Sequence, residues 1–200
     1  MRKIGVIGFG GRLGDLIQNV LLELGMDVKI AAVADTDLTA VRGRLRLPGL
    51  TADGIRFYTD AREMLDNEEL DGCMIGTRCN THTSYAVEVL RRNIPLFLEK
   101  PVSTTIEDLR ALAAAGKATT AQTVVSFPLR TSGIVRKAKA IIDSGEIGEV
   151  QHVQAWNNVP YGAGYYHTWC RDESVTGGLF LQKATHDLDY IQYILGHRPV

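Results

Sequence analysis

A glycine cluster near the start of the chain has the composition of a phosphate-binding turn. Gly8-Phe9-Gly10-Gly11-Arg12-Leu13-Gly14 follows a short apolar run and precedes a stretch with helical apolar spacing. Glycines in this context let the chain turn sharply and bring backbone N–H groups and a helix N-terminus against a pyrophosphate. Leu13 takes the sixth position of G-x-G-x-x-G, so the spacing reads instead as G-x-x-G-x-x-G. We expect a dinucleotide-phosphate site here, with a tight turn that binds nothing as the alternative.

An acidic residue follows at the distance that a dinucleotide site requires. Asp35 ends the next apolar run, 35 − 14 = 21 residues beyond Gly14. A carboxylate at this place accepts hydrogen bonds from both hydroxyls of an adenosine ribose and repels a 2′-phosphate. NAD is therefore expected over NADP, although Arg12 or Arg42 would offset part of the repulsion and keep NADP possible. The alternative is that Asp35 or Asp37 caps the following helix.

Glu99-Lys100-Pro101 places a lysine at the end of another apolar run. In an open α/β sheet, the carboxyl ends of the strands face the ligand crevice. The positive nicotinamide ring of NAD⁺ would repel an ammonium group and favour the neutral amine, which is the form that accepts a proton. We expect Lys100 to take part in the chemistry, and the alternative is a solvated lysine after a strand.

The last helical stretch carries a second polar group. At 100° per residue, one narrow face holds Gln182, His186, Asp189 and Tyr193. The opposite side is apolar and comprises Phe180, Leu181, Leu188, Ile191, Ile194 and Leu195. Lys183 lies one turn before His186. The pattern predicts that the apolar side packs and that the polar face carries functional groups, whereas a lone histidine on a helix is usually structural or solvated.

The first hundred residues alternate short apolar runs with amphipathic stretches, which is typical of βαβ units around a parallel sheet. The predicted strands are 3–8, 28–34, 55–58, 72–76, 95–99 and 122–127. The predicted helices are 13–24, 38–45, 61–65, 82–92 and 105–115. We therefore expect a doubly wound α/β dinucleotide-binding domain over residues 1–123.

The pattern changes after Pro128. A helix is predicted over 133–143, a strand with one solvated face over 149–156, and a helix over 179–195. The segment 157–176 is rich in Tyr, Gly and Trp, and we expect it to face a ligand. Residues 124–200 thus begin a second domain. Because one strand cannot form a sheet alone, that domain is incomplete or is completed by residues outside this sequence.

Composition excludes several classes of protein. The 200 residues carry 22 Lys+Arg against 23 Asp+Glu, a net charge of −1, with 45% hydrophobic and 22% charged residues, so disorder is not expected. Without a Lys/Arg cluster, neither nucleic acid nor an anionic membrane is an expected partner, and a small molecule is. No run approaches the ~20 apolar residues of a membrane span, and the apolar start is too short for a signal peptide, so a cytoplasmic location is expected.

Cysteine usage also limits the chemistry. Cys73, Cys79 and Cys170 form no C-x-x-C pair and are odd in number. They indicate neither a disulfide framework nor a zinc site, and no metal is expected. Cys73 is predicted to be a core residue.

Taken together, these residues resemble the Gfo/Idh/MocA family, the group of glucose-fructose oxidoreductase, inositol dehydrogenase and rhizopine-catabolism proteins. The resemblance spans nearly the whole chain. It rests on the glycine turn, Asp35, Gly76-Thr77-Arg78-Cys79-Asn80-Thr81-His82, Glu99-Lys100-Pro101, Ser144-Gly145-Glu146-Ile147-Gly148, and the stretch from Gly177-Gly178 through His186 to Asp189.

The resemblance implies a Rossmann domain that binds a nicotinamide cofactor, followed by an α/β domain whose open sheet covers the substrate and forms homo-oligomer contacts. Lys100 matches the catalytic lysine of the family, with a cis peptide bond to Pro101, and His186 matches the histidine of its D-x-x-x-H signature. Arg130 matches an arginine at the start of the second domain. The cofactor contacts implied beyond the glycine turn and Asp35 are Thr77, Arg78, Asn80, His82, Glu99 and Lys100.

Two positions depart from the family pattern. Gln182 stands where the signature has aspartate, so a carboxylate that would orient His186 or relay its proton is replaced by a neutral amide. Lys183 is expected to compensate by contacting substrate oxygens, as in a related subgroup. Arg78 stands where many members carry proline, and it would bind an acidic group or cap the turn.

The expected activity is hydride transfer between NAD(P) and a secondary alcohol or ketone of a sugar, inositol or related polyol. Lys100 would accept the hydroxyl proton, and His186 would bind the same oxygen or relay the proton. The expected substrate contacts are Lys183, Asp189, Gln182, His167, Tyr166, Asp172 and Arg130. The alternatives are an NAD-dependent glycosidase on the same scaffold and a non-catalytic nucleotide-sensing regulatory protein.

Overall fold

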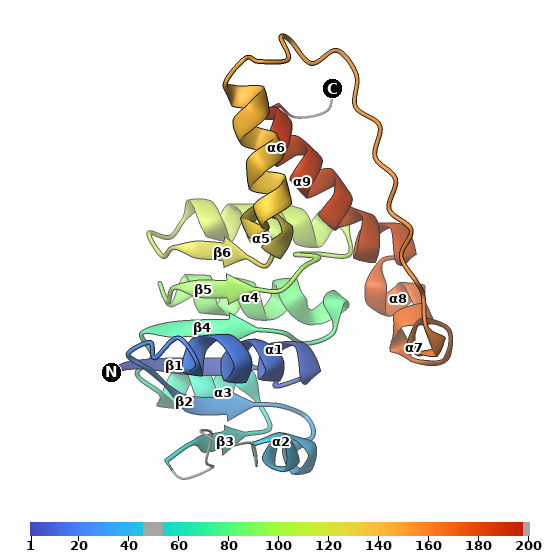
Figure 1. The fold of residues 1–200 in the computed structure, drawn as a ribbon. Helices are drawn as coiled ribbons and strands as arrows, with labels where there is room; N and C mark the ends of the chain where they lie inside the picture. The colour runs from blue at the N-terminus through green and yellow to red at the C-terminus, as the bar shows by residue number, and fades with distance from the viewer. Residues whose placement is uncertain (46–53, 198–200) are drawn as a thin grey trace. The chain divides into compact units, whose positions relative to one another are not determined.

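The computed structural model describes residues 1–45 and 54–197, which form two compact units, Met1–Val125 and Ser126–Val200 (Figure 1). The first unit combines a parallel sheet with helices, and the second is helical over its described residues. Among the described residues, no helix is long and apolar enough to cross a membrane.

Six parallel strands form the sheet of the first unit, in the order β3-β2-β1-β4-β5-β6. Their bounds are β1 Arg2–Ile7, β2 Val28–Ala34, β3 Arg56–Tyr58, β4 Gly72–Ile75, β5 Leu96–Leu98 and β6 Thr123–Val125. The chain runs outward from β1 in one direction and then returns to continue outward from β4. The carboxyl ends of β1 and β4 are therefore the point where the direction of winding reverses, which is where open α/β sheets bind ligands.

Helices cover both faces of this sheet. Their bounds are α1 Gly11–Leu16, the π-helical turn η1 Ile17–Leu22, α2 Leu38–Arg44, α3 Ala61–Asn67, the 3-10 turn η2 Cys79–Thr81, α4 His82–Arg91 and α5 Ile106–Lys117. One buried cluster joins α3, α4 and α5 to a face of the sheet, and a second joins α1, η1 and α2 to the other. The predicted doubly wound fold is confirmed.

The helix starts show why these segments are helical. The carboxylate of Asp37 accepts from the Ala40 N–H at 2.9 Å, that of Asp60 from the Arg62 N–H at 2.6 Å, and the Thr105 hydroxyl from the Asp108 N–H at 3.1 Å. Each side chain satisfies an N–H group that has no partner within its helix. Of the two candidate caps for α2, Asp37 is the one used.

In the second unit, the helices are the 3-10 turn η3 Pro128–Thr131, α6 Gly133–Asp143, α7 Ala163–His167, the 3-10 turn η4 Trp169–Arg171, α8 Glu173–Thr176, the π-helical turn η5 Phe180–Ala184 and α9 Thr185–Leu195. The helix predicted over 133–143 is confirmed. The helix predicted over 179–195 is present, although it begins as a π-helical turn. The aromatic segment 157–176, for which no helix was predicted, contains three short helices, α7, η4 and α8.

The strand predicted over 149–156 is wrong. This segment runs without regular structure, and Val153 and Trp156 are 43% and 80% exposed. A strand requires a hydrogen-bonded neighbour, and residues 126–197 contain no other strand to supply one. The alternating pattern therefore has no ladder to join and no core on which to place its apolar side chains.

Candidate functional site

The glycine turn follows β1 at the carboxyl edge of the sheet. Gly8 has φ +80°, a conformation that L side chains rarely adopt, and a Cβ there would lie 2.8 Å from the Thr77 backbone nitrogen. Only glycine therefore lets this turn pass the loop after β4. Gly10 and Gly11 follow in open space, with no atom closer than 3.8 Å to a built Cβ. Phe9 and Leu13, both fully buried, can offer a ligand only their backbone.

The missing sixth glycine has a structural counterpart that sequence reasoning did not identify. A Cβ on Gly76, directly after β4, would lie 2.5 Å from Cγ of Leu13. The close approach of helix and sheet, which a glycine on the helix usually allows, is thus obtained here by a glycine on the strand side. The signal was present, since Gly76 opens the stretch 76–82, but its packing partner lies 63 residues away (76 − 13).

Asp35 lies directly after β2 and beside the glycine turn. Its carboxylate accepts from the Phe9 N–H at 2.9 Å and from the Asp37 N–H at 3.0 Å, one bond on each oxygen. Each carboxylate oxygen has a second lone pair. Asp35 therefore fastens the turn to β2 and keeps acceptor capacity for a ligand.

Arginines surround the turn, and each has a protein partner. Arg12 Nε donates to Glu99 Oε1 at 3.2 Å, which joins the start of α1 to the end of β5. Arg44 donates to the Phe9 carbonyl at 3.0 Å, and the Arg42 guanidinium lies 3.8 Å from the centre of the Phe57 ring. Arg12 and Arg42, expected as possible partners for a 2′-phosphate, are thus engaged elsewhere.

Lys100 is the second residue after β5 and is half-buried, and its peptide bond to Pro101 is cis as expected. His82 begins α4, and its ring is 1% exposed. Its Nδ1 lies 2.7 Å from the Pro101 carbonyl oxygen and its Nε2 lies 3.2 Å from that of Thr77. The expectation that His82 contacts the cofactor is corrected, because both ring nitrogens face backbone carbonyls inside the protein.

The charge state of His82 follows from this burial. Desolvation lowers the pKa of the ring below its ordinary value of 6.5, against the opposing effect of the two carbonyls, and the ammonium of Lys100 lowers it further. His82 is therefore a neutral imidazole near pH 7. A neutral ring has one N–H, which the shorter contact assigns to Nδ1.

The loop between β4 and α4 holds the other expected contacts. Arg78 and Asn80 are exposed there, and Thr77 is half-buried with its hydroxyl 2.8 Å from that of Thr81. The loop lies at the carboxyl end of β4, beside the glycine turn through Gly8 and Thr77. Its placement agrees with a role in binding, which stays a prediction for these side chains.

In the second unit, two expected substrate contacts pair with each other. Arg130 Nε donates to Asp189 Oδ2 at 2.8 Å and Nη2 donates to Oδ1 at 2.5 Å, while the Asp189 side chain is only 10% exposed. This carboxylate raises the pKa of Arg130. Asp189 and Arg130 therefore fasten α9 to η3, a role that replaces the direct substrate contact expected of each.

The two faces of the last helix are not divided as predicted. Gln182 is 8% exposed, and His186 and Tyr193 contact Phe127 and Arg130 through their rings, at 5.8 Å and 5.4 Å. Phe180 and Leu188, predicted to pack, are 75% and 45% exposed. Leu181, Ile191, Ile194 and Leu195 on the predicted packing side are half-buried, so residues of both faces make contacts. Lys183 lies on the same helix with Nζ 4.5 Å from the Tyr165 ring centre.

The aromatic segment forms a hollow of its own, of about 410 Å³. Tyr161, Tyr165 and Tyr166 line it together with Arg171 and Glu173. Of the three contacts expected here, Tyr166 lines the hollow and His167 is exposed at the end of α7. Asp172 caps α8, since its carboxylate accepts from the Ser174 N–H at 3.0 Å, and its contact with a substrate stays a prediction.

Cys73 lies in the core as predicted. Burial raises the pKa of its thiol to about 12, so it is not a nucleophile. Among the described residues, no cluster of three His, Cys, Asp or Glu side chains is placed to hold a metal ion.

Two family descriptions match this chain. Residues 2–127 match the oxidoreductase family with an NAD-binding Rossmann fold, and residues 135–200 match the GFO/IDH/MocA C-terminal domain. The chain is 27% identical over 199 residues to the rhizopine catabolism protein MocA of Rhizobium meliloti, covering 98% of this chain and 58% of that protein. It is 29% identical over 199 residues to inositol 2-dehydrogenase 2 of Saccharopolyspora erythraea, covering 99% and 55%.

A solved structure is similar over the same extent. The crystal structure of myo-inositol 2-dehydrogenase from Lactobacillus plantarum superposes with a TM-score of 0.85 at 25% identity, covering 100% of this chain and 57% of that one. The chain thus spans a little over half the length of these relatives. With the glycine turn, Asp35 and Lys100 at one edge of a doubly wound sheet, and with both of its units matched, the chain belongs to the Gfo/Idh/MocA oxidoreductase family.

Proposed function

We propose that this protein takes part in the NAD-dependent oxidation of a secondary alcohol on a cyclic polyol or sugar. The observation that carries the proposal is the convergence of the glycine turn, Asp35 and Glu99-Lys100 at the carboxyl ends of β1, β2 and β5 in one sheet. Relatives named as inositol dehydrogenases support the substrate class. Because the chain covers little more than half of those relatives, the activity and the substrate are our proposal.

The residues at this edge suit NAD. The backbone of Gly10 and Gly11 borders open space, and the first N–H groups of a helix are free to bind a pyrophosphate. Asp35 would hold the adenosine ribose with its remaining lone pairs. The Asp35 carboxylate would repel a 2′-phosphate, and the ion pair of Arg12 with Glu99 reduces what that arginine can offset, so NAD is favoured over NADP.

Lys100 is the proposed proton acceptor. When NAD is bound, its nicotinamide ring supplies the hydride acceptor. The neutral Lys100 amine would take the substrate hydroxyl proton onto Nζ, and the protein would release that proton to solvent afterwards. Glu99 lies beside this lysine in sequence, and its ion pair with Arg12 neutralises a carboxylate that would otherwise repel a pyrophosphate.

The second unit would supply substrate selectivity. We propose His186, Lys183 and Gln182 as its substrate-side groups, because Gln182 and Lys183 are adjacent in η5 and His186 lies about one turn later in α9. Arg130 and Asp189 would act as positioning residues that hold this helix, rather than as contacts.

The experiment is a thermal-shift titration of the protein with NAD and with NADP, followed by a panel of inositols and sugars read as NADH absorbance. NAD is expected to raise the melting temperature at concentrations about tenfold lower than NADP, and at least one polyol is expected to give stoichiometric NADH. Sugar release without NADH, or NAD binding without turnover of any polyol, would contradict the proposal.

A further inference from the structure

The first turn of α4 holds the backbone that directly follows Lys100. His82 donates from Nδ1 to the Pro101 carbonyl at 2.7 Å, and Thr83 donates from its hydroxyl to the Val102 carbonyl at 2.9 Å. Two consecutive residues of the helix therefore bind two consecutive carbonyls of the other segment. This paired contact fixes both the position and the direction of the chain where it leaves the lysine.

Water cannot replace these bonds, because the contact is buried. His82 is 1% exposed and Thr83 is 3% exposed, and Pro101 is buried as well. A buried carbonyl that loses its donor carries the full cost of desolvation. In the neutral ring the N–H lies on Nδ1, so Nε2, which is 3.2 Å from the Thr77 carbonyl oxygen, does not donate to it. The ring nevertheless lies between the loop after β4 and the loop after β5.

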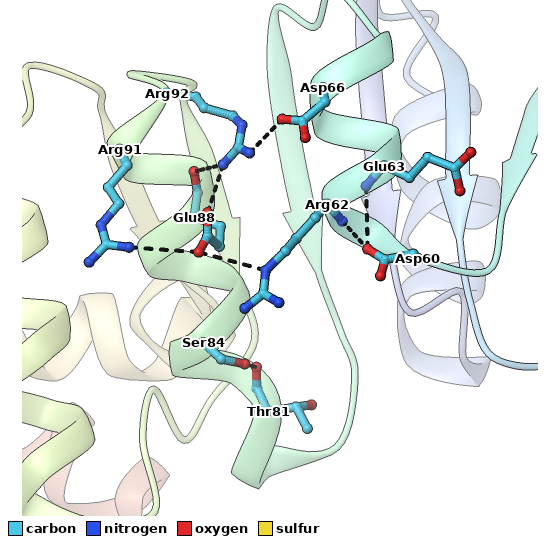
Figure 2. A network of polar contacts seen from close by, with 9 residues as sticks. All are labelled: Asp60, Arg62, Glu63, Asp66, Thr81, Ser84, Glu88, Arg91 and Arg92. Carbon is cyan, nitrogen blue, oxygen red and sulfur yellow. Dashed lines mark hydrogen bonds and ion pairs between the residues drawn. The ribbon is translucent and has the colours of Figure 1, made fainter.

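The helix that carries His82 and Thr83 is itself fixed in place. Figure 2 shows Glu88 of α4 accepting from Arg92, which also donates to Asp66 of α3, with Nη1 to Oε2 at 2.8 Å and Nη2 to Oδ1 at 2.6 Å. Ala86, Val89 and Leu90 of the same helix are buried in the core against the sheet. A group held by such an element is positioned more precisely than one on a loop.

We propose that His82 and Thr83 are positioning residues that set the place of the Lys100 amine through the carbonyls of Pro101 and Val102. The inference rests on the proposed role of Lys100. The Thr83 hydroxyl donates to the segment after Lys100 and not to the glycine turn or Asp35, so its loss should alter proton transfer and leave cofactor affinity unchanged. His82 also lies against Thr77, beside Gly8, so Thr83→Val is the variant that separates the two effects. Small displacements of a catalytic group are enough to slow its reaction.

The test compares variants that differ in one donor. Thr83→Val removes the hydroxyl and keeps the shape of the side chain, whereas Thr83→Ser keeps the hydroxyl. His82→Leu removes the donor, whereas His82→Asn keeps an N–H near the place of Nδ1. Ser84→Ala is the matched control, because it breaks an exposed bond in the same helical turn, from the Ser84 hydroxyl to the Thr81 carbonyl (Figure 2).

Two measurements are made on each variant. The first measurement determines kcat on the polyol and, separately, the Kd for NAD. The second uses mass spectrometry to follow the rate at which acetic anhydride labels Lys100, relative to its rate at the exposed Lys117. Thr83→Val and His82→Leu are expected to lower kcat about tenfold or more, and Thr83→Val should keep an NAD Kd within about twofold of the wild type. Their relative labelling of Lys100 should change about threefold or more, and Thr83→Ser, His82→Asn and Ser84→Ala should stay close to the wild type.

The outcomes separate this inference from the proposed function. If folded Thr83→Val keeps both the wild-type kcat and the wild-type labelling of Lys100, the inference is overturned, whatever the fate of His82→Leu. If the wild type oxidises no polyol, the proposed function fails, and the labelling of Lys100 still decides whether Thr83 and His82 position it. A uniform change in all variants, Ser84→Ala included, would show a general loosening of α4 and would also overturn the inference.

Discussion

The two units hold their functional residues in different ways. In the first, Asp35 and Glu99-Lys100 directly follow strands whose ladder bonds and buried neighbours set their positions, and α4, which supports Lys100, has five buried residues. In the second, Lys183, His186 and Asp189 project from η5 and α9, and α9 itself has no buried residue. Its helix is held by individual contacts such as Arg130 with Asp189.

In the first unit the backbone sets the positions of the functional groups, whereas in the second unit individual side-chain contacts set them. At a strand end, position follows from register, so the first unit should tolerate little change of backbone conformation and should respond to it sharply. On a helix surface, each side chain depends on one or two partners. Substitutions in the second unit should therefore cost less stability and act more locally.

The largest expected effect lies in the first unit, at Lys100. Lys100→Met should lower turnover about 100-fold or more while the NAD Kd changes less than about twofold, because the amine acts on the proton and not on the cofactor. Steady-state kinetics and a binding titration measure the two. Lys117→Met, an exposed lysine of α5, is the control. Unchanged turnover in Lys100→Met would remove this residue from the mechanism.

Gly8 tests whether the backbone conformation of the first unit limits its stability. Gly8→Ala forces a side chain into φ +80° and against Thr77, so it should lower the free energy of unfolding by about 2 kcal/mol and weaken NAD binding. Urea unfolding and an NAD titration measure both effects. Gly11→Ala, where a Cβ meets no atom within 4 Å, is the matched control for stability. Equal stability of the two variants would contradict the assigned role of Gly8.

Asp35 tests the choice of cofactor. Asp35→Ala removes both ribose acceptors and the charge that opposes a 2′-phosphate, so the ratio of NAD to NADP affinity should fall about tenfold. The variant also loses the acceptor for the Phe9 N–H, which should weaken binding of both cofactors. Parallel titrations with NAD and NADP separate these effects. If the ratio of NAD to NADP affinity does not change, Asp35 does not bind the ribose hydroxyls.

The burial of His82 predicts a pH dependence of stability. The folded pKa lies below 6.5, so the unfolded chain binds more protons, and stability falls as the pH drops from about 7 through 6.5 toward the folded pKa. The contribution of one such group cannot exceed about 1.4 kcal/mol per pH unit. Urea unfolding between pH 7.5 and 5.5 measures the slope, which should be shallower in His82→Asn. An identical slope in both proteins would show that His82 is not the group responsible.

The smallest effect is expected in the second unit. Asp189→Asn breaks the bidentate pair with Arg130, whose side chain is 47% exposed, and should cost about 1 kcal/mol or less. Urea unfolding measures this loss, and Lys139→Gln, which removes the partner of Asp143, is a control for an ordinary exposed pair. A loss as large as that of Gly8→Ala would contradict the proposed difference between the units.

Sequence patterns were sufficient for the first unit because its strands are buried on both faces. All six predicted strands are present, within about two residues at each end, since continuous apolar runs separated by helical stretches leave few alternatives. The Lys100 to Pro101 cis bond, expected from the family resemblance, is present too. Pattern reasoning missed Thr83 and Gly76, because the partners that give them meaning are Val102 and Leu13, distant in sequence.

In the second unit, sequence patterns gave wrong predictions where the outcome depends on which other segment packs against the element. The alternation over 149–156 predicted a strand that has no partner, and the helical wheel of the last helix predicted an apolar packing face on which Phe180 and Leu188 are exposed. Periodicity shows that a segment has two chemically different sides. It does not show which side meets another element.

The sequence alone determined the doubly wound first unit, the family and the order of the residues proposed for chemistry, because these depend on local periodicity and on short motifs next to strands. Tertiary structure decided which of those residues are accessible and which are supports. It enclosed His82 between two carbonyls, committed Asp189 to Arg130 and used Asp172 as a cap. Hydrogen-bond partners and burial arise from contacts between segments far apart in the chain, which no local pattern encodes.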